Sequence, residues 1–424
     1  MLGRNLSILL LAICIFTSCT ITRAIRYGNA AVDDYTVFTQ DSVHKAVYNS
    51  SFAEKSTSSP IDTLKLDIYR AKADTLLRLT VSELMDYAQV PSAAIMLQDG
   101  EVIFEHYSGG WSKESQSCIF SVTKTITSMF CGIALKEGYI NSVDDYVTDY
   151  IPEFKDADPN FSKLKIEHLL DMTAGLDFKE NYALNPFSKM ARLYMGNNSL
   201  KTLKRLKFSH NPGENYSYNS ATTAILGIVI ERAVRKPYAE YLSEKIWKPL
   251  GMSRDALIGV DDTRHRVAKS YAGLTTNVRD LAKIGQLFIN NGCWEGVQII
   301  DPQFVARCYS ANIAGIKGKQ QGRYSYSWYW GVDDEKLGKR KYFNTIEELE
   351  QYYKNHPEKS VYTIYKNLDN GYYAVLHNGG YWAYGLYGQI LYVNPERNFI
   401  GVFLGADRLK EFNLVFDAIA TSFL

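Results

Sequence analysis

The stretch CIFSVTKTITSMFCGIALKEGYI, residues 118–140, decides the fold of this chain more than any other. It begins with Ser121-Val122-Thr123-Lys124 and continues as an apolar segment with helical spacing. Residues i and i+3 lie on the same side of a helix, so the Lys124 amine can lie beside the Ser121 hydroxyl. A serine hydroxyl is a weak nucleophile until a base takes its proton, and burial can lower the pKa of a lysine enough to make it that base. The motif therefore predicts a Ser/Lys nucleophile at the start of a buried helix.

The Ser-x-x-Lys pattern is weak evidence alone, because the chain contains it three times. Ser42 and Lys45 lie in a polar stretch with no apolar segment that would desolvate a lysine. Ser162 precedes a helix-like segment and is typical of a cap or loop serine. Ser121 is the one that opens a long apolar helix. An N-cap serine followed one turn later by a surface lysine remains the competing interpretation of these residues.

The composition is that of an ordinary globular protein of enzyme size. A chain of 424 residues can bury a large core, as one large domain or two lobes. The formal net charge of +1 predicts no basic surface for nucleic acid. The seven histidines show no His-x-His or His-x-x-x-His spacing and the cysteines no Cys-x-x-Cys, so neither a metal nor another cofactor is expected.

The first 19 residues, MLGRNLSILLLAICIFTSC, have the features of a secretory leader. The apolar run over 6–16 is too short to span a membrane. Its ending on Thr17-Ser18-Cys19 resembles a bacterial lipobox, in which the cysteine is lipidated and becomes the first mature residue. We therefore expect a lipid-anchored protein of the bacterial cell envelope, with its catalytic domain in the periplasm or at the outer surface. A plain signal peptide with an incidental Cys19 is the alternative.

The remaining cysteines are expected to be free and buried. An exported protein can form disulfides, but two of these residues lie near the Ser121 helix, where small buried thiols are common. The four residues are Cys118, Cys131, Cys293 and Cys308.

The pattern along the chain divides it into a leader, a wrapping tether over 20–70 and a catalytic domain over 71–424. Leucine spacing predicts a helix over 71–90, stopped before a proline. Asp99-Gly100 between two strand-like runs predicts a hairpin.

The middle of the catalytic domain is expected to be a helical lobe over about 125–265. A charged insertion over about 333–370 is expected to contain one short helix. Strand-like segments lie near both chain ends. The predicted fold is therefore α+β: one antiparallel sheet assembled from the two ends, flanked by helices, with an inserted helical lobe and a site in the cleft between them.

Two further motifs accompany Ser121. The stretch NPGENYSYNS, residues 211–220, contains Tyr218 ahead of an apolar helix, and a tyrosine beside a Ser/Lys pair can exchange protons with it. The stretch AYGLYGQ, residues 383–389, is a glycine-spaced strand edge that can bring backbone N–H donors to a developing oxyanion. The N-terminus of the Ser121 helix can supply another donor. A packing tyrosine and a glycine-relieved strand are the plainer interpretations.

In this order the three motifs resemble the class C β-lactamase superfamily, which also contains penicillin-binding proteins and related esterases. The resemblance extends over about residues 75–424 and implies a β-lactamase/transpeptidase-like fold. The 6-aminohexanoate-dimer hydrolases are the most similar branch, because they also have Tyr-x-Ser after a Pro-Gly turn and a Gly-x-x-Gly-Gln strand. Other similar stretches are KEGYINSVDDYVTDYIPEF, IEHLLDMTAGLDF and TTNVRDLAKIGQLFINNGCWEGVQII.

The resemblance implies a role for each motif residue. Ser121 would be the nucleophile and Lys124 its base, with Tyr218 as proton relay, the last two acting as one coupled unit. The backbone N–H groups of Ser121 and Leu386 would form the oxyanion hole. The residues implied to lie along the substrate cleft are Ser220, Ala383, Tyr384 and Gly385.

Two departures from the β-lactamase pattern bear on the substrate. The Lys-Thr-Gly or His-Thr-Gly triplet that holds a substrate carboxylate is absent, and Ala383-Tyr384-Gly385 occupies that strand. His377-Asn378-Gly379 is expected to form the turn before it. Ser220 stands where β-lactamases usually carry asparagine. Both departures argue against a dedicated β-lactamase and leave ester or amide hydrolysis intact.

The sequence therefore predicts an exported serine hydrolase that cleaves small esters or amides through an acyl-enzyme. A β-lactamase or D-alanyl-D-alanine carboxypeptidase is the enzymatic alternative. A surface binding protein on a retired hydrolase scaffold is the non-enzymatic one, and loss of a motif residue would favour it. The expected partners are a small substrate and a membrane. Specificity is expected in cleft loops such as 176–200 and 310–330, which carry no readable code.

Overall fold

The computed structural model describes residues 20–54, 59–70, 75–181, 185–310, 324–333, 335–336, 339–357, 362–367, 370–406 and 412–422. The predicted leader with Cys19 lies outside these residues, as do most of the 310–330 loop and parts of the 333–370 insertion.

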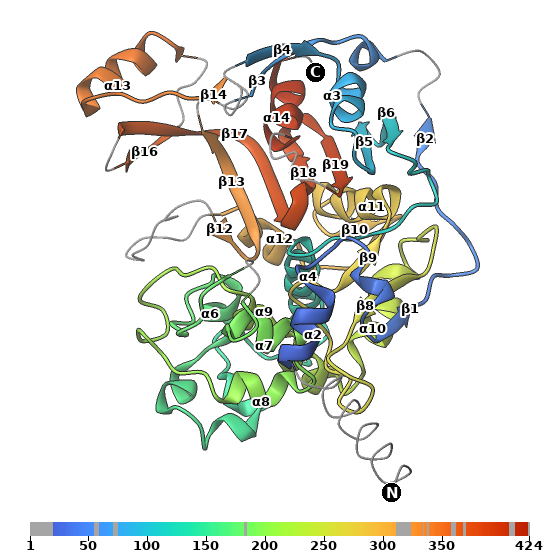
Figure 1. Cartoon of the computed structure of the whole chain (residues 1–424), viewed down its shortest axis with the longest axis vertical. Helices are drawn as coiled ribbons and strands as arrows, with labels where there is room; N and C mark the ends of the chain where they lie inside the picture. The colour runs from blue at the N-terminus through green and yellow to red at the C-terminus, as the bar shows by residue number, and fades with distance from the viewer. Residues whose placement is uncertain are drawn as a thin grey trace, which may run out of the picture.

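A nine-stranded sheet joins the two ends of the described chain (Figure 1). Its order is β12-β13-β17-β18-β19-β5-β6-β2, with β16 also paired to β17. The C-terminal β19 lies beside the N-terminal β5, with Phe399 opposite Gln98. The predicted antiparallel sheet is confirmed, apart from the short parallel β2–β6 pair. The strands are β2 Ala53–Glu54, β5 Ser92–Gln98, β6 Glu101–Ser108, β12 Tyr324–Ser325, β13 Trp328–Asp333, β16 Tyr362–Asn367, β17 Gly371–Gly385, β18 Gln389–Asn394 and β19 Phe399–Gly405.

The predicted hairpin at Asp99-Gly100 is confirmed. Gln98 pairs with Glu101, so the connection has two residues, and both have positive φ, 54° and 81°. Such a turn matches the twist of the strands, and glycine at its second position relieves the backbone strain.

Helices cover both faces of the sheet. On one face α11 (Val278–Ile289) packs against β18, β19 and β5, and α4 (Val122–Lys136) packs against β17 and β18. On the other face α14 (Phe412–Ser422) packs against β17, β18 and β19, while α3 (Val81–Tyr87) contacts β6. Strand β19 is buried along its whole length, which explains its uninterrupted apolar sequence.

The helical lobe surrounds α4 and α9, two helices that are apolar on nearly every side (Figure 1). A helix of this kind must be buried, and α4 is buried from Val122 to Ala134. The lobe includes α5 Val147–Tyr150, α6 Ile166–Leu170, α7 Lys189–Met195, α8 Ser199–Lys204, α9 Ser220–Val234 and α10 Tyr238–Leu242. A second sheet, in the order β1-β8-β9-β7, contains β1 Gln40–Val43, β7 Ser117–Cys118, β8 Ala256–Gly259 and β9 Leu274–Thr276.

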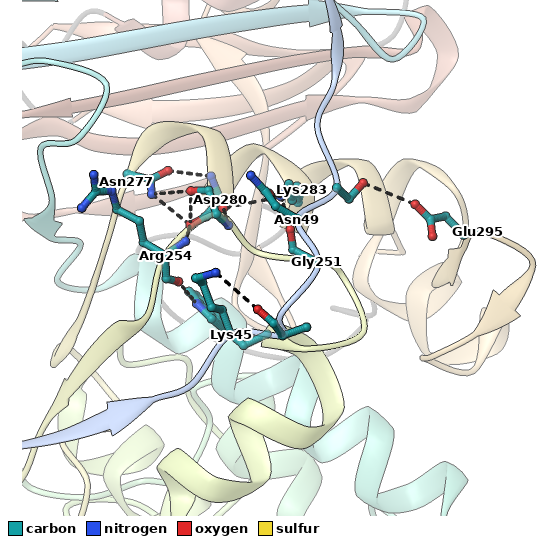
Figure 2. Close-up of polar contacts among 12 residues, drawn as sticks. Lys45, Asn49, Gly251, Arg254, Asn277, Asp280, Lys283 and Glu295 are labelled. Atoms are coloured by element: carbon teal, nitrogen blue, oxygen red, sulfur yellow. Dashed lines mark hydrogen bonds and ion pairs between the residues drawn. The ribbon is translucent and has the colours of Figure 1, made fainter.

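The segment before residue 55 lies along the domain as α2 (Thr20–Tyr27), a turn and β1 (Figure 1). After β1 it is held by polar contacts with the loop after α10 and with α11 (Figure 2). The Lys283 ammonium donates to the Gly251 carbonyl at 2.5 Å and to Asn49 Oδ1 at 3.4 Å. The backbone N–H of Lys45 donates to Asp255 Oδ1 at 2.8 Å. These contacts hold the wrapping segment against the α10–β8 connection.

Two local predictions are wrong. Residues 75–79 form strand β4, paired with β3 (Leu66–Arg70), so the helix predicted over 71–90 is only α3. The helix begins at Val81 because the Thr80 side chain accepts from the Glu83 N–H while the Glu83 carboxylate accepts from the Thr80 N–H.

The second error concerns His377-Asn378-Gly379, which lies inside the long strand β17 instead of forming a turn before it. The pairs Trp330–Tyr381 and Val332–Leu376 place residues 377–380 opposite residue 331 alone. This is a bulge, which adds residues to one strand without ending it, and Gly379 adopts φ 77° within it.

The charged insertion contains the predicted short helix, α13 (Ile346–Lys354), which packs on β17. A small separate core of Phe343, Leu349, Tyr353 and Ala374 supports it. The remaining short elements are α12 Pro302–Cys308, β10 Cys293–Trp294, β11 Val297–Gln298, β14 Glu335–Lys336 and β15 Lys339–Arg340.

Candidate active site

Ser121 is the first residue before helix α4 and is partly exposed at a pocket. Its side chain makes no capping hydrogen bond, so its hydroxyl is not committed to the helix backbone. The preceding residue, Phe120, is buried with φ 44°, a strained conformation for an aromatic residue. Its ring meets that of Tyr387 edge to face, with centroids 5.7 Å apart. The turn that presents the Ser121 hydroxyl is therefore held by the packing of the buried Phe120 ring on Tyr387.

The Lys124 side chain is buried, at 1% exposure, and points at Ser121. Its ammonium nitrogen lies 2.9 Å from Ser121 Oγ and 2.9 Å from the Tyr271 carbonyl oxygen. Burial lowers the pKa of Lys124 to about 8, because removing the amine from water disfavours its charged form. The surface-lysine interpretation is therefore excluded. A lysine with this pKa is partly neutral near pH 8, so it can accept a proton from the hydroxyl it contacts.

Tyr218 lies beside this pair. The centroid of its ring is 5.0 Å from the Lys124 ammonium nitrogen, a distance at which ring and cation attract. On its other side the ring lies among Tyr324 and Tyr329, with centroids 6.0 Å and 6.3 Å away. The structure thus brings together the three residues that the motifs named, from α4 and from the segment before α9.

The other two Ser-x-x-Lys pairs have no such surroundings. Ser162 donates to the Pro159 carbonyl on an exposed turn, and Lys165 forms a surface ion pair with Asp144 at 2.7 Å. Ser42 is exposed on β1. Burial of the lysine therefore distinguishes the Ser121 motif from its two copies.

The end of strand β17 comes close to the nucleophile segment. A Cβ atom on Gly385 would overlap the carbonyl oxygen of Ile119, so only glycine allows this approach. The next residue, Leu386, lines the same pocket as Ser121. This places the two predicted oxyanion-hole residues at one cavity.

Gln389 holds the loop that follows. Its buried amide nitrogen donates to the Leu386 carbonyl at 3.2 Å and to the Gly405 carbonyl at 2.6 Å, while its oxygen accepts from the Gly405 N–H at 3.2 Å. The glutamine of the Gly-x-x-Gly-Gln motif is thus a positioning residue, which ties the Leu386 turn to β19.

Gly385→Ala is expected to lower turnover about 10²–10³-fold, the usual loss when one oxyanion donor is displaced. The new methyl group must push the strand end away from Ile119 and with it the Leu386 N–H. Steady-state kinetics together with thermal unfolding check this. The matched control is Gly259→Ala, where the nearest atom to the new Cβ is Lys269 Cδ at 3.4 Å, and it is expected to stay within about twofold of wild type. Normal turnover by a folded Gly385→Ala variant would place the oxyanion hole elsewhere.

The predicted cleft residues are only partly confirmed by position. Ser220 lines the pocket with Ser121. Ala383 is 1% exposed in the main core, and Tyr384 packs against the second core on the opposite face of the sheet. Successive residues of a strand point to opposite faces, and here both faces are covered, so neither side chain is part of the Ser121 pocket. That these residues lie along the substrate cleft stays a prediction. Gly385 contributes through its lack of a side chain.

Glu180 is a residue near the site that the sequence motifs did not reveal. One of its carboxylate oxygens accepts the backbone N–H of Ser220, and the other is buried with no hydrogen-bond partner among the described residues. Its negative charge opposes the effect of burial on the Lys124 pKa. Glu180 lies in the 176–200 loop, where no periodic pattern marked it.

The cysteine prediction is confirmed in its main point. Cys118, Cys131, Cys293 and Cys308 are all free, although Cys293 is only half-buried. Burial raises the pKa of Cys118 to about 12, which makes it an unreactive thiol.

Asp261, Asp262 and His265 form an acidic group near α8 that the histidine spacing did not signal. One atom from each residue lies within 4.8 Å of the others. The carboxylates already accept backbone hydrogen bonds, Asp261 from the Ser199 N–H at 2.8 Å and Asp262 from the Arg264 N–H at 2.9 Å. Their evident role is to hold this loop.

Comparison with known proteins agrees with this geometry. The family model described as Beta-lactamase matches residues 77–419. The chain belongs to the β-lactamase family. This confirms the family that the motifs resemble, and makes the protein a member of a family of serine hydrolases. The 6-aminohexanoate-dimer hydrolase of Paenarthrobacter ureafaciens is 27% identical over 299 residues, which cover 66% of this chain and 74% of that protein.

A candidate D-alanyl-D-alanine carboxypeptidase of Salmonella agona is 24% identical over 216 residues. These cover 40% of this β-lactamase-family chain and half of the relative.

Solved structures confirm the β-lactamase/transpeptidase-like fold. A candidate 6-aminohexanoate-dimer hydrolase from Bacillus anthracis has a TM-score of 0.66 at 20% identity, covering 91% of this chain and 89% of that one. EstCE1, a hydrolase with promiscuous acyltransferase activity, has a TM-score of 0.56 at 17% identity, covering 80% and 95%. A class C β-lactamase has a TM-score of 0.54 at 13% identity, covering 80% and 93%.

None of the helices in the described part of the chain combines the length and the apolar character that a membrane-spanning helix needs.

Proposed function

We propose that this β-lactamase-family protein hydrolyses small esters or amides through an acyl-enzyme formed on Ser121. The observation that carries the proposal is the 2.9 Å contact between the buried Lys124 amine and the Ser121 hydroxyl at the mouth of a pocket. Burying a lysine amine costs desolvation free energy. A buried amine in contact with a partly exposed hydroxyl is typical of an activated nucleophile.

In the proposed first step Ser121 Oγ attacks the substrate carbonyl carbon while the neutral Lys124 amine takes the hydroxyl proton. The carbonyl oxygen becomes an oxyanion between the backbone N–H groups of Ser121 and Leu386. The proton then passes through Tyr218 to the leaving alcohol or amine as the carbonyl–heteroatom bond breaks. A water molecule releases the acyl group from Ser121 by the same path in reverse.

The proposed substrates are short esters and linear amides, the amides being suggested by the similarity to the 6-aminohexanoate-dimer hydrolase of Paenarthrobacter ureafaciens. The strand beside the nucleophile carries Ala383-Tyr384-Gly385, which offers no cation for the carboxylate of a β-lactam. Hydrolysis of p-nitrophenyl butyrate should therefore exceed that of nitrocefin by more than about 100-fold in kcat/KM, the discrimination available when a charged partner is missing.

The experiment compares p-nitrophenyl esters, nitrocefin, linear 6-aminohexanoate oligomers and D-alanyl-D-alanine peptides with the purified protein. A fluorophosphonate label reports the nucleophile independently. The Salmonella relative supports the carboxypeptidase alternative, which efficient release of D-alanine would favour. Efficient nitrocefin turnover would favour a β-lactamase. Binding of substrate without turnover or labelling would favour a retired scaffold.

We also propose that residues 1–19 are a lipoprotein leader and that Cys19 anchors the protein in the bacterial cell envelope. The support is the apolar run that ends on Thr17-Ser18-Cys19. A fatty-acid probe should label the wild-type protein and not Cys19→Ala, whereas Cys14→Ala should still be labelled. A wild-type protein without label would leave a simple cleaved signal.

A further inference from the structure

We infer that the N-terminal strap, residues 20–32, forms one wall of the acyl-binding slot, and that Ala24 limits the length of the acyl chain that the slot accepts. The inference rests on the proposed acyl-enzyme function and adds a specificity-determining element to it.

The strap lines the pocket that contains the nucleophile. Ala24 and Ala30 share this pocket with Ser121 and Leu386. Another part of the wall comes from α7, which neighbours α2, through Met190, Tyr194 and Met195. Figure 1 shows α2 beside α7 in the helical lobe, although the two helices lie far apart in the sequence. A long-range contact of this kind makes the first described residues part of the reaction site.

Hydrogen bonds attach the strap to both sides of the reaction centre. The Val32 carbonyl accepts the Cys118 N–H at 2.9 Å, three residues before Ser121. The Ala30 carbonyl accepts the Tyr387 hydroxyl, one residue after Leu386. The strap is thus bonded to the nucleophile segment and to the oxyanion turn.

The residues that follow secure the strap to α7. The Tyr194 hydroxyl donates to Asp34 Oδ2 at 2.6 Å, and the rings of Phe38 and Tyr194 meet edge to face with centroids 5.4 Å apart. Tyr27 packs on Phe38 in turn, at 6.3 Å. Both walls of the slot therefore belong to one packed unit.

The chemistry assigns the slot to the acyl half of the substrate. The leaving group must depart towards Tyr218, the group proposed to protonate it, and that ring lies among Tyr324 and Tyr329. The slot lies between Ser121 and the α2–α7 walls instead. Its lining is mainly apolar, although Asn29, Asn181 and Asn185 also contribute, and it favours an apolar chain. Each methylene that enters should raise kcat/KM about fourfold, the equivalent of ~0.8 kcal/mol.

Ala24 is the sensitive position because it is 2% exposed and faces the slot, while its neighbour Ile25 is 68% exposed. The pair offers a matched test on one helix. Ala24→Phe should fill the slot, and Ile25→Phe should leave it unchanged.

The test measures kcat/KM of the full chain on p-nitrophenyl acetate, butyrate, hexanoate and octanoate. Ala24→Phe should lose more than about tenfold on hexanoate and octanoate, with a much smaller loss on acetate. Ile25→Phe should keep the wild-type profile. Met195→Ala, on α7, should improve the longest ester relative to acetate. Ala24→Val, a smaller enlargement at the same strap position, should shift the profile in the same direction as Ala24→Phe, and it serves as the test if thermal unfolding shows that Ala24→Phe does not fold.

The two failures are distinguishable. A wild-type protein that neither hydrolyses any ester nor reacts with fluorophosphonate would overturn the proposed function. A wild-type protein that hydrolyses the esters, with the same chain-length profile in folded Ala24→Phe or, failing that, in folded Ala24→Val, would overturn the role of the strap alone.

Discussion

Ser121→Ala is expected to reduce ester hydrolysis to the background rate in buffer and to abolish fluorophosphonate labelling. Removing the nucleophile removes the covalent path altogether, so the loss should be at least about 10⁴-fold, as in serine hydrolases in which one member of the catalytic unit is deleted. The fold should survive, because the Ser121 side chain makes no capping bond to α4 and a lost cap would in any case cost only about 1 kcal/mol. Ester kinetics, gel-based labelling and thermal unfolding measure the three effects.

The matched control for this variant is Ser162→Ala. Ser162 belongs to another Ser-x-x-Lys motif but donates to the Pro159 carbonyl on an exposed turn. Its variant should keep both activity and label. Equal labelling of wild type and Ser121→Ala would mean that the nucleophile is another residue.

Lys124→Met is expected to slow acylation about 10²–10⁴-fold, the usual contribution of a positioned base. Methionine keeps much of the apolar stem in a fully buried site while removing the amine that contacts Ser121 Oγ. Single-turnover kinetics with a slow ester report acylation directly. Lys165→Met, which removes a surface ion pair with Asp144, is the control expected to have no effect.

The pH dependence of the wild type is part of the same prediction. Burial lowers the pKa of Lys124 to about 8, from 10.5 for a free lysine side chain. The base is the neutral amine, which exists above this pKa, so the acylation rate should rise with pH to a plateau, with a midpoint near 8. Lys124→Met should lose this rise. A flat profile in the wild type would exclude Lys124 as the titrating base.

Tyr218→Phe tests the second member of the unit. If lysine and tyrosine pass one proton along one path, the double variant with Lys124→Met should be scarcely slower than the slower single variant, since groups acting together are not additive. Tyr216→Phe is the control, because its ring also packs on Tyr324, with centroids 5.6 Å apart. Wild-type turnover by Tyr218→Phe would make Tyr218 a packing residue.

Local rules explain the parts of the fold that the sequence predicted correctly. The hairpin at Asp99-Gly100 depends on two residues with positive φ, and α9 on an Asn219 cap followed by an apolar run. The helix prediction is wrong for residues 75–79 because the leucines of this segment suit either a helix or a strand. Pairing with β3, which is nearby only in the folded chain, decided for the strand.

The site shows the same division. Spacing alone places Lys124 one helical turn from Ser121, because i and i+3 meet on any helix. The sequence also named Tyr218 and Leu386 through resemblance to a family. It could not show that the Ala383 and Tyr384 side chains point into two different cores. Side chains alternate along any strand, and only the helices that cover each face of the sheet decide whether that face is buried or open.

The sequence by itself therefore determined the nucleophile motif and the order of the main elements, which follow from near-neighbour patterns. It determined the family through the resemblance of its motifs to those of known proteins. Only the tertiary structure decided that Lys124 is buried, with its pKa lowered by desolvation. It also placed the Lys124 amine on the Tyr271 carbonyl, 147 residues away. It alone brought Glu180 to Ser220 and the strap at Ala24 to the pocket of Ser121. No local sequence pattern predicts that these segments meet. The contacts between them are stabilised by burial and hydrogen bonds that exist only once the chain has packed.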